Sequence, residues 1–213
     1  MSVPARGTPF VVAAPSGTGK TTVCLALRQR DPNLLLSVSH TTRKPRSGER
    51  QGVDYHFVGD DEFRRLIDAG AFLEWALYNG NRYGTSWKAI EGPLAQGLDV
   101  LLEIEVQGAR QVRARLSDAR LIFLLPPSMR VLTSRLAGRA TDTAEQVAAR
   151  LHTARSELAV VEEFDYAVVN DELERCVASV QEIIAGERAG ATSELRRRFT
   201  TVKAADALRR EAR

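Results

Sequence analysis

A short run near the N-terminus combines small residues, a lysine and a threonine in a spacing that suits phosphate binding. Residues 14–21 read APSGTGKT; they follow an apolar stretch, 10–13, and lead into a helix-like stretch, 23–27. A strand, a glycine-bearing turn, Lys-Thr and a helix form the setting that a phosphate-binding P-loop requires. Backbone N–H groups in such a turn and the positive end of the helix attract phosphate oxygens. The run therefore predicts a nucleoside triphosphate site, with Lys20 at the β- and γ-phosphates and the Thr21 hydroxyl on Mg²⁺.

The first position of the P-loop pattern G-x-x-x-x-G-K-[ST] holds Ala14 instead of glycine. We expect this residue at the strand end, where a methyl group fits without a positive φ angle. The alternative interpretation is a strand-to-helix turn that binds nothing. Because Gly19, Lys20 and Thr21 stand in register after an apolar strand, the sequence favours phosphate binding.

A stretch that is rich in cations and hydroxyls suits a second phosphate. It spans residues 39–50, and its shortage of apolar residues predicts that it lies outside the core. Arg43 and Arg46 in this stretch offer forked guanidinium donors, and Tyr55 and Tyr83 add phenolic hydroxyls. These four side chains are therefore candidates for a phosphate site separate from the P-loop.

Glu74 is an acid within an otherwise apolar, β-prone stretch, 72–78. A carboxylate can accept hydrogen bonds from N1–H and the N2 amino group of guanine, whereas adenine presents an acceptor at N1 and leaves the carboxylate unpaired. Ser39 and Thr85 can add hydroxyl contacts to the same base. Taken alone, Glu74 is explained more simply as a carboxylate at the edge of a strand that reaches solvent.

Arginines gather around a break between two predicted helices. Arg135 precedes this break, Arg139 lies in it, and Arg150 follows it. Arginines on a mobile segment can fold over phosphates, neutralise charge in the transition state and exclude water. The alternative is a solvated helix surface, which we prefer for Arg155.

Apolar runs bounded by turn residues alternate with helix-like segments through most of the chain. This alternation predicts an α/β fold whose parallel sheet has helices on both faces and binds ligands beyond the carboxyl ends of its strands. For the region from about 38 to 88, the pattern instead predicts a small, mostly β lobe with a hairpin turn at Asn79-Gly80. A helix is predicted to follow this lobe, with Ser86 as its N-cap and Gly97 at its end. The predicted strands are 10–13, 34–38, 54–58, 72–78, 100–106, 119–125 and 166–170; the predicted helices beyond the P-loop helix are 60–70, 87–96, 107–116, 129–137, 144–161 and 173–188.

Composition restricts the class of protein only loosely. The 213 residues suit one α/β domain with inserted pieces. A net charge of +3 and a pI of about 9.1 are weak evidence for nucleic acid, since arginines that bind nucleotide phosphates explain them as well. Cys24 and Cys176 are predicted to be buried free thiols. We expect no membrane span and a cytoplasmic protein, with a solvated, partly ordered tail after Gly190.

The motifs taken together resemble the guanylate kinase family over roughly residues 8–188. They are APSGTGKT at 14–21, SVSHTTRKPR at 37–46, GVDY at 52–55, FLEW at 72–75, YGT at 83–85, LEIEVQG at 102–108, GR at 138–139 and VND at 169–171. The resemblance implies a P-loop kinase with a three-layer α/β/α arrangement, a parallel central sheet, an inserted, mostly β GMP-binding lobe and a helical lid. The implied parts are a core of 1–37, 95–128 and 165–190, a GMP-binding lobe of 38–94, a lid of 129–164 and a tail of 191–213.

The family transfers the γ-phosphoryl group of ATP to GMP or dGMP with Mg²⁺, so the resemblance implies these substrates and a role in purine nucleotide metabolism. It implies no nucleic-acid or membrane partner, and a protein that is a monomer or a homodimer. It implies catalytic roles for Lys20, Arg43, Arg139 and Arg150, and Mg²⁺ contact through Thr21, with Glu105 as a further candidate ligand. The implied ATP-binding residues are Ala14, Pro15, Ser16, Gly17, Thr18, Gly19, Lys20, Thr21, Thr22, Arg135 and Asn170. The implied GMP-binding residues are Ser39, Arg43, Arg46, Tyr55, Glu74, Tyr83, Thr85 and Glu103.

The chain departs from the family pattern at three positions besides Ala14. The family usually carries Asp where Glu103 and Glu105 stand, with Glu tolerated at the first, and glycine where Ala140 follows the lid arginine. Two alternatives stay open: a catalytically silent kinase-like module that binds phosphopeptides, and a related P-loop kinase with a ribose-phosphate acceptor. The intact P-loop argues against the first, and Ser39, Glu74 and Tyr83 argue against the second.

Overall fold

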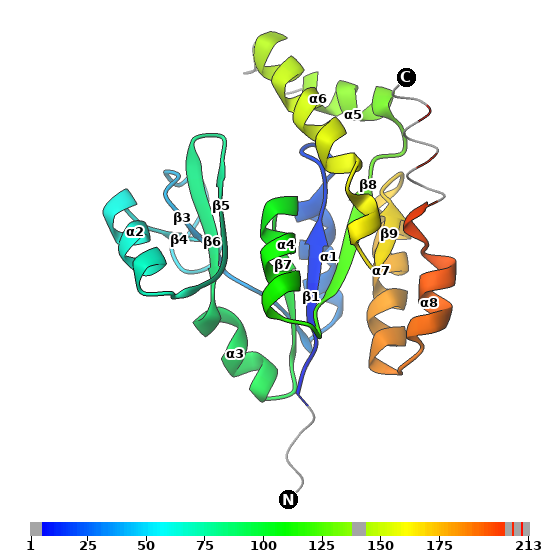
Figure 1. Cartoon of the computed structure of the whole chain (residues 1–213), viewed down its shortest axis with the longest axis horizontal. Helices are drawn as coiled ribbons and strands as arrows, with labels where there is room; N and C mark the ends of the chain where they lie inside the picture. Colours follow the sequence, from blue (N-terminus) through cyan, green and yellow to red (C-terminus); the bar gives the residue numbers. More distant parts are fainter. Residues whose placement is uncertain (1–5, 138–143, 203–205, 207–209, 211–213) are drawn as a thin grey trace, which may run out of the picture. The chain divides into compact units, whose positions relative to one another are not determined.

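The structure is a computed structural model that describes residues 6–137, 144–202, 206 and 210 (Figure 1). Strands and helices alternate along most of the chain, as the apolar runs predict. The strands are β1 (Pro9–Ala13), β2 (Leu34–Leu36), β3 (His40–Thr41), β4 (His56–Phe57), β5 (Phe72–Tyr78), β6 (Asn81–Ser86), β7 (Asp99–Glu103), β8 (Arg120–Leu125) and β9 (Tyr166–Val169). The helices are α1 (Lys20–Arg30), α2 (Asp60–Asp68), α3 (Trp87–Ala95), α4 (Val106–Arg115), α5 (Met129–Ala137), α6 (Ala144–Leu158), the short 3₁₀ helix η1 (Val161–Glu163), α7 (Leu173–Arg188) and α8 (Thr192–Arg198).

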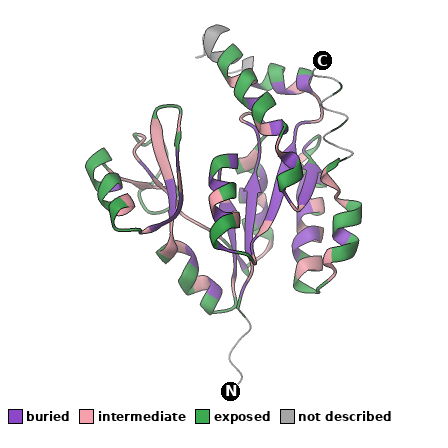
Figure 2. Cartoon of the chain, viewed as in Figure 1, coloured by how far each residue is buried: buried purple, intermediate pink, exposed green. Residues whose placement is uncertain are grey.

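The central sheet has five strands in the order β2-β7-β1-β8-β9. β2 runs parallel to β7, with Leu34 opposite Asp99, and β8 runs parallel to β9, with Ile122 opposite Tyr166. Every residue of β1 is buried, as are five of the six residues of β8 (Figure 2). Continuous burial is typical of parallel strands that are covered on both faces. The predicted α/β fold with a parallel central sheet is confirmed.

A second sheet has four strands in the order β4-β3-β6-β5, and we call this sheet together with α2 the β lobe. Its β5–β6 hairpin turns at Asn79 and Gly80, whose φ angles of 48° and 75° are those of a tight hairpin turn. Phe63 of α2 stacks on Phe72 of β5 with ring centroids 4.5 Å apart, which ties the helix to the sheet. The mostly β segment predicted around 38–88 is therefore present.

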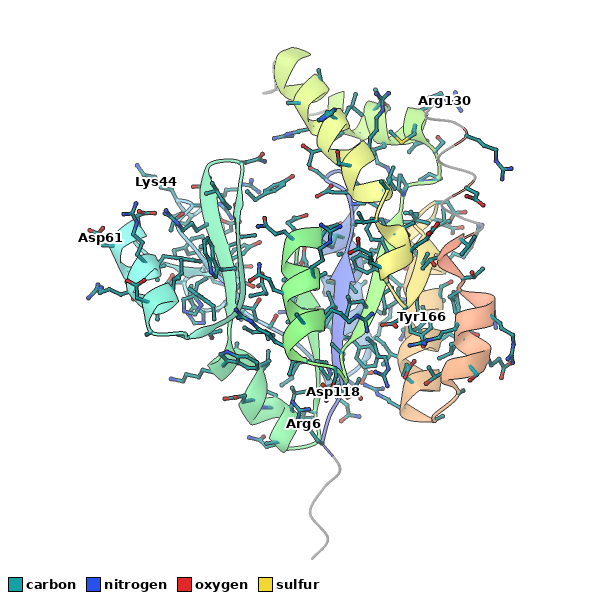
Figure 3. The ribbon with its side chains drawn as sticks, in the orientation of Figure 1. Arg6, Lys44, Asp61, Asp118, Arg130 and Tyr166 are labelled. Carbon is teal, nitrogen blue, oxygen red and sulfur yellow. The ribbon has the colours of Figure 1, made fainter. Side chains whose placement is uncertain are left out.

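Contacts divide the chain into two compact units. The first combines Met1–Val11 with Pro32–Ala119 and contains the β lobe, α3, β7 and α4. The second combines Val12–Asp31 with Arg120–Arg213 and contains the loop after β1, α1 and the elements from β8 onward. In the first unit, Arg6 pairs with Asp118 (Figure 3).

Residues 192–198, which were predicted to belong to a solvated, partly ordered tail, instead pack against α7. These residues form α8, whose Leu195 is only 5% exposed. Leu195 packs against Gly186 of α7, where an added Cβ would lie 2.8 Å from its Cδ1 atom. Two of the three arginines of α8 are paired: Arg196 bonds to Asp165, and Arg198 bonds to Glu182. The helix is ordered because it buries a leucine and places its charges opposite carboxylates.

Glu187 joins α7, α8 and the central sheet through a cluster of hydrogen bonds. It accepts from the Tyr166 hydroxyl of β9 (labelled in Figure 3), from Arg120 Nε at 2.7 Å and from Thr192 Oγ1 at 3.0 Å. Burial and the neighbouring carboxylate raise the pKa of Tyr166 above its usual range, so the phenol stays protonated and donates. The cluster is a structural anchor for the C-terminal helices.

Several local predictions also need correction. Ser86 is the N-cap residue of α3, but its side chain makes no capping hydrogen bond. The strand predicted over 100–106 ends at Glu103, and Glu105 is instead the N-cap residue of α4. Thr41 lies in the polar stretch predicted to be outside the core, yet it is fully buried because it pairs within the second sheet as part of β3.

Both cysteines are buried free thiols, as predicted: Cys24 lies on α1 and Cys176 on α7. Burial raises the pKa of Cys176 to about 12, so it stays a neutral thiol near pH 7. Across the part of the chain that the structure describes, no helix combines the length and apolar character needed to cross a bilayer.

Candidate functional site

The P-loop connects β1 to α1, and its backbone requires glycine at two positions. Gly17 and Gly19 have φ angles of 86° and 94°, which residues with a side chain rarely adopt. A Cβ atom would lie 2.9 Å from Leu136 Cδ2 at Gly17 and 2.9 Å from Asn170 Nδ2 at Gly19. Asn79 is the one non-glycine with a positive φ among the described residues, so Ala14 fits the strand end as predicted.

The start of α1 offers a site for an anion. Gly19 is the N-cap residue, Lys20 is the first residue of the helix, and the first turn carries no acid. The first N–H groups of a helix lack partners within the helix and carry partial positive charge. The hydroxyl-bearing Thr21 and Thr22 are exposed, Lys20 and Ser16 are half-buried, and Pro15 is buried. This arrangement can hold the phosphates of a nucleotide.

The carbonyl group of Thr18 is held by two residues of the same unit. Asn170 Nδ2 donates to this carbonyl at 2.6 Å, and Arg135 Nη1 donates to it at 3.3 Å. Arg135 Nη2 also lies 3.5 Å from the Asn170 carbonyl. Asn170 and Arg135 therefore fix the shape of the P-loop, a role that was not predicted from the sequence. Their predicted contacts with ATP stay predictions.

In the β lobe, three of the predicted guanine-binding residues lie together. Glu74 is 3% exposed, and its Oε1 atom accepts a hydrogen bond from the Thr85 N–H at 2.8 Å. Ser39 Oγ lies 3.2 Å from Thr85 Oγ1, within hydrogen-bond distance. The interpretation of Glu74 as a solvent-reaching edge carboxylate is wrong, because its side chain turns inward to the backbone of the neighbouring strand.

Three of the four residues predicted for a second phosphate are also neighbours. The Arg43 guanidinium lies 5.4 Å from the ring centroid of Tyr55, and the rings of Tyr55 and Tyr83 are 6.1 Å apart. Glu49, and to a lesser extent Tyr83, raises the pKa of the Arg43 guanidinium group. Arg46, the fourth, has an exposed side chain. The lobe thus gathers a guanidinium group and two phenols.

Glu49 organises this cluster and was not predicted. Its carboxylate accepts from Arg43 Nη1 at 3.0 Å and Nη2 at 2.8 Å, and from the Arg46 N–H at 2.7 Å. The hydrogen bond with Arg43 lowers the pKa of Glu49 and raises the pKa of Arg43. A sequence signal did exist, since Glu49 is the one acid in the cationic stretch 39–50.

The remaining candidates are spread over other elements. Glu103 ends β7 and is half-buried, as is Glu105 at the start of α4. Arg150 lies half-buried on α6, and Arg155 is exposed, as expected for a solvated surface. Arg139 and Ala140 lie outside the described residues. Within the described ranges, no three His, Cys, Asp or Glu side chains are grouped closely enough to hold a metal ion.

The P-loop follows the first strand of a parallel sheet, and an inserted β lobe carries its own polar cluster. Together these features define a P-loop kinase. The sequence matches the guanylate kinase family profile over residues 6–187. The crystal structure of guanylate kinase from Anaplasma phagocytophilum is similar, with a TM-score of 0.73, 34% identity and coverage of 87% of this chain and 88% of that chain.

Two further relatives agree with this class. A guanylate kinase of Methylobacillus flagellatus is 49% identical over 183 residues, which cover 86% of this chain and 91% of the relative. A guanylate kinase of Dechloromonas aromatica is 50% identical over 178 residues, which cover 84% and 88%. The chain belongs to the guanylate kinase family, and it is a kinase.

Proposed function

We propose that this protein transfers the γ-phosphoryl group of ATP to GMP, and to dGMP, and forms GDP or dGDP. Its relatives are named guanylate kinases, which supports this reaction. The observation that carries the choice of acceptor is the buried Glu74 carboxylate beside the hydroxyls of Ser39 and Thr85. We place the reaction in cytoplasmic purine nucleotide metabolism, where it recycles GMP, and we expect a monomer or homodimer.

Glu74 is suited to select guanine because an ionised carboxylate only accepts hydrogen bonds. Guanine offers two donors side by side, N1–H and the N2 amino group. Glu74 Oε1 already accepts from the Thr85 N–H, but each carboxylate oxygen has a further acceptor position. Adenine would place its N1 acceptor against the carboxylate and would leave both groups unpaired, which discriminates strongly between bases.

The phosphate of GMP would lie at Arg43, Tyr55 and Tyr83, with Arg46 as a further cation from the same stretch. Forked guanidinium donors and phenolic hydroxyls match phosphate oxygens in geometry and charge. Glu49 holds Arg43 by two hydrogen bonds, which supports a preformed orientation of its guanidinium group. The same residues would also hold the phosphate of dGMP, since they do not depend on the sugar hydroxyl.

Transfer would proceed by in-line attack of a GMP phosphate oxygen on the γ-phosphorus of ATP. That oxygen is already anionic, so no strong base is needed, and positioning with charge neutralisation supplies most of the catalysis. Lys20 at the start of α1 is the proposed cation at the β- and γ-phosphates, and Arg150, with Arg139, would neutralise charge on the transferred group.

The residues present fit a bound Mg²⁺ ion. Mg²⁺ binds nucleotide phosphates, waters and one or two protein oxygens, and the exposed Thr21 hydroxyl in the first turn of α1 supplies such an oxygen. Glu105 is a second candidate. When bound, the ion would neutralise charge on the β- and γ-phosphates.

A panel of acceptors tests this function. We would incubate purified protein with ATP, MgCl₂ and one of GMP, dGMP, AMP or ribose 5-phosphate, and separate the products by anion-exchange chromatography. GDP and dGDP should form, and Glu74→Gln should raise the KM for GMP and reduce the preference for GMP over AMP. A Glu74→Gln variant with unchanged preference would contradict the guanine assignment, and faster phosphorylation of ribose 5-phosphate would contradict the proposed acceptor.

A further inference from the structure

We propose that α4 determines the base specificity of the GMP site, with Gly108 and Gln111 as positioning residues for the Glu74 carboxylate. This inference rests on the proposed function of Glu74 in guanine recognition. Glu74 lies on β5, which is an edge strand of the four-stranded sheet. α4 packs against β5 within the same unit and meets it through three residues on one helix face, Gly108, Gln111 and Arg115.

Gly108 leaves the space that one carboxylate oxygen of Glu74 occupies. A Cβ atom at residue 108 would lie 2.4 Å from Glu74 Oε2 and 3.1 Å from Glu74 Cδ. Real Cβ atoms do not approach an oxygen this closely, so any side chain at position 108 would displace the carboxylate. Gly108 lies within a helix, where glycine is less favourable than alanine, and its φ angle is not positive. The close approach of Glu74 is therefore what requires glycine here.

Gln111 holds the backbone of β5 beside Glu74. Its Nε2 atom donates to the Trp75 carbonyl at 2.7 Å, and its Oε1 atom accepts from the Trp75 N–H at 3.2 Å. An edge strand leaves alternate N–H and C=O groups without a partner strand, and the Gln111 amide bonds both groups of one residue. One turn further along α4, Arg115 Nη1 donates to the carbonyls of Phe72 and Leu73 at 2.9 and 2.5 Å. α4 thus fixes β5 on both sides of Glu74.

These contacts place the carboxylate between two elements. Thr85 of β6 bonds one oxygen, Gly108 of α4 borders the other, and Gln111 fixes the strand from which the side chain extends. Guanine presents two donors to one carboxylate, so its recognition depends on the position and angle of that carboxylate. Hypoxanthine keeps N1–H but lacks the N2 amino group. A displaced Glu74 should therefore lose the preference for GMP over inosine monophosphate.

Gly108→Ala is the direct test, because the added methyl group displaces the tip of a flexible side chain and suits a helix. The variant should keep its melting temperature, raise the KM for GMP about tenfold or more, and lower the GMP-to-inosine monophosphate ratio of kcat/KM to a similar extent, with kcat little changed. Gly92→Ala is the matched control, since Gly92 lies in α3 of the same unit and nothing lies within 4 Å of its added Cβ. It should leave the melting temperature unchanged and keep the KM for GMP, the kcat and the ratio of kcat/KM within about twofold of the wild type.

Gln111→Ala gives a second, independent variant. It removes both bonds to Trp75, so the KM for GMP should rise and selectivity should fall in the same direction as in Gly108→Ala. Gln96→Ala removes an exposed glutamine at the end of α3 and should change neither value. A purely structural role of Gln111 would lower the melting temperature without changing the ratio between the two acceptors.

The wild type and Glu74→Gln, measured alongside, separate the two proposals. If Glu74→Gln loses selectivity while Gly108→Ala and Gln111→Ala keep it within about twofold, α4 does not position the carboxylate, and the proposed function stands. If the wild type forms no GDP, or accepts both monophosphates equally, the proposed function itself fails. Loss of selectivity in all three variants, with the two controls unchanged, supports the inference.

Discussion

Lys20 is the residue whose role depends least on the choice of acceptor. It is the first residue of α1 and follows Gly19, the last glycine of the P-loop, which has a positive φ angle. Lys20→Ala should lower kcat by about 100-fold or more while the KM for GMP changes little, because the lost charge acts on the transferred phosphoryl group. Steady-state kinetics with varied GMP at saturating ATP would measure both values. Lys88→Ala, which removes an exposed lysine on α3, is the control. A normal kcat in Lys20→Ala would refute the role of Lys20 in transfer.

Glu49 illustrates how one acid can organise several cations. It binds both terminal nitrogens of Arg43 and the backbone N–H of Arg46. Glu49→Gln should raise the KM for GMP by about tenfold, because Arg43 loses a charge-assisted bond that sets its orientation. Glu182→Gln also removes a carboxylate that pairs with an arginine, but on the C-terminal helices, and should leave the KM unchanged. A lower KM in Glu49→Gln would instead show that Glu49 competes with the GMP phosphate for Arg43.

The P-loop and the cationic stretch could be predicted because their chemistry lies in contiguous residues. The contacts that hold them could not. Asn170 bonds the carbonyl of Thr18 across 152 positions of the chain, and Gly108 borders Glu74 from a different element. Neither residue type signals its partner, since asparagine and glycine have many ordinary roles in loops and helices.

Among the helices, we expect α8 to stabilise the fold through its packing on α7. Its Leu195 fills the space above Gly186 of α7. Leu195→Ala should lower the free energy of unfolding by about 2–4 kcal/mol, because it removes buried methyl groups and leaves a cavity. Urea unfolding followed by circular dichroism would measure this loss. Arg197→Ala, an exposed change on the same helix, should have little effect. Equal stability of Leu195→Ala and wild type would mean that α8 does not pack on α7.

Elements with strong apolar periodicity were predicted best. α7 begins and ends at the predicted residues, because its apolar residues recur on one face over 16 residues. α8 was missed because seven residues, three of them arginine, contain too little periodic signal. The two-residue strand β3 was missed for a similar reason: it lies in a polar stretch and pairs only through tertiary contacts.

At the scale of the whole molecule, His40 links stability to pH. Its ring stacks on that of His56 with centroids 4.6 Å apart and lies edge-on to Phe72. Burial lowers the pKa of His40 below 6.5, and the charge of His56 lowers it further, whereas Glu62 opposes the shift. The unfolded chain therefore binds a proton more readily than the folded protein. Stability from this residue is complete above about pH 6.5 and is lost as the pH falls through the folded-state pKa.

Unfolding in urea between pH 8 and pH 5 would test this linkage. The free energy of unfolding should fall as the pH decreases through this range, and His40→Gln should show a smaller dependence, because glutamine does not titrate. The range stays above the pH at which most carboxylates protonate. An identical pH dependence in His40→Gln and wild type would assign the effect to other groups.

A competition assay between GMP and AMP tests whether this chain combines a P-loop for ATP with a lobe that admits guanine. Purified protein would receive unlabelled ATP, MgCl₂ and equal concentrations of GMP and radiolabelled AMP, so that labelled ADP reports transfer to AMP separately from the ADP that every transfer leaves from ATP. GDP and labelled ADP formed at early times would be quantified by anion-exchange chromatography. We predict that GDP exceeds ADP formed from AMP by about 100-fold or more, with one ATP consumed per GDP. Comparable phosphorylation of both monophosphates would show that the lobe does not select guanine, and the absence of GDP would refute the proposed reaction.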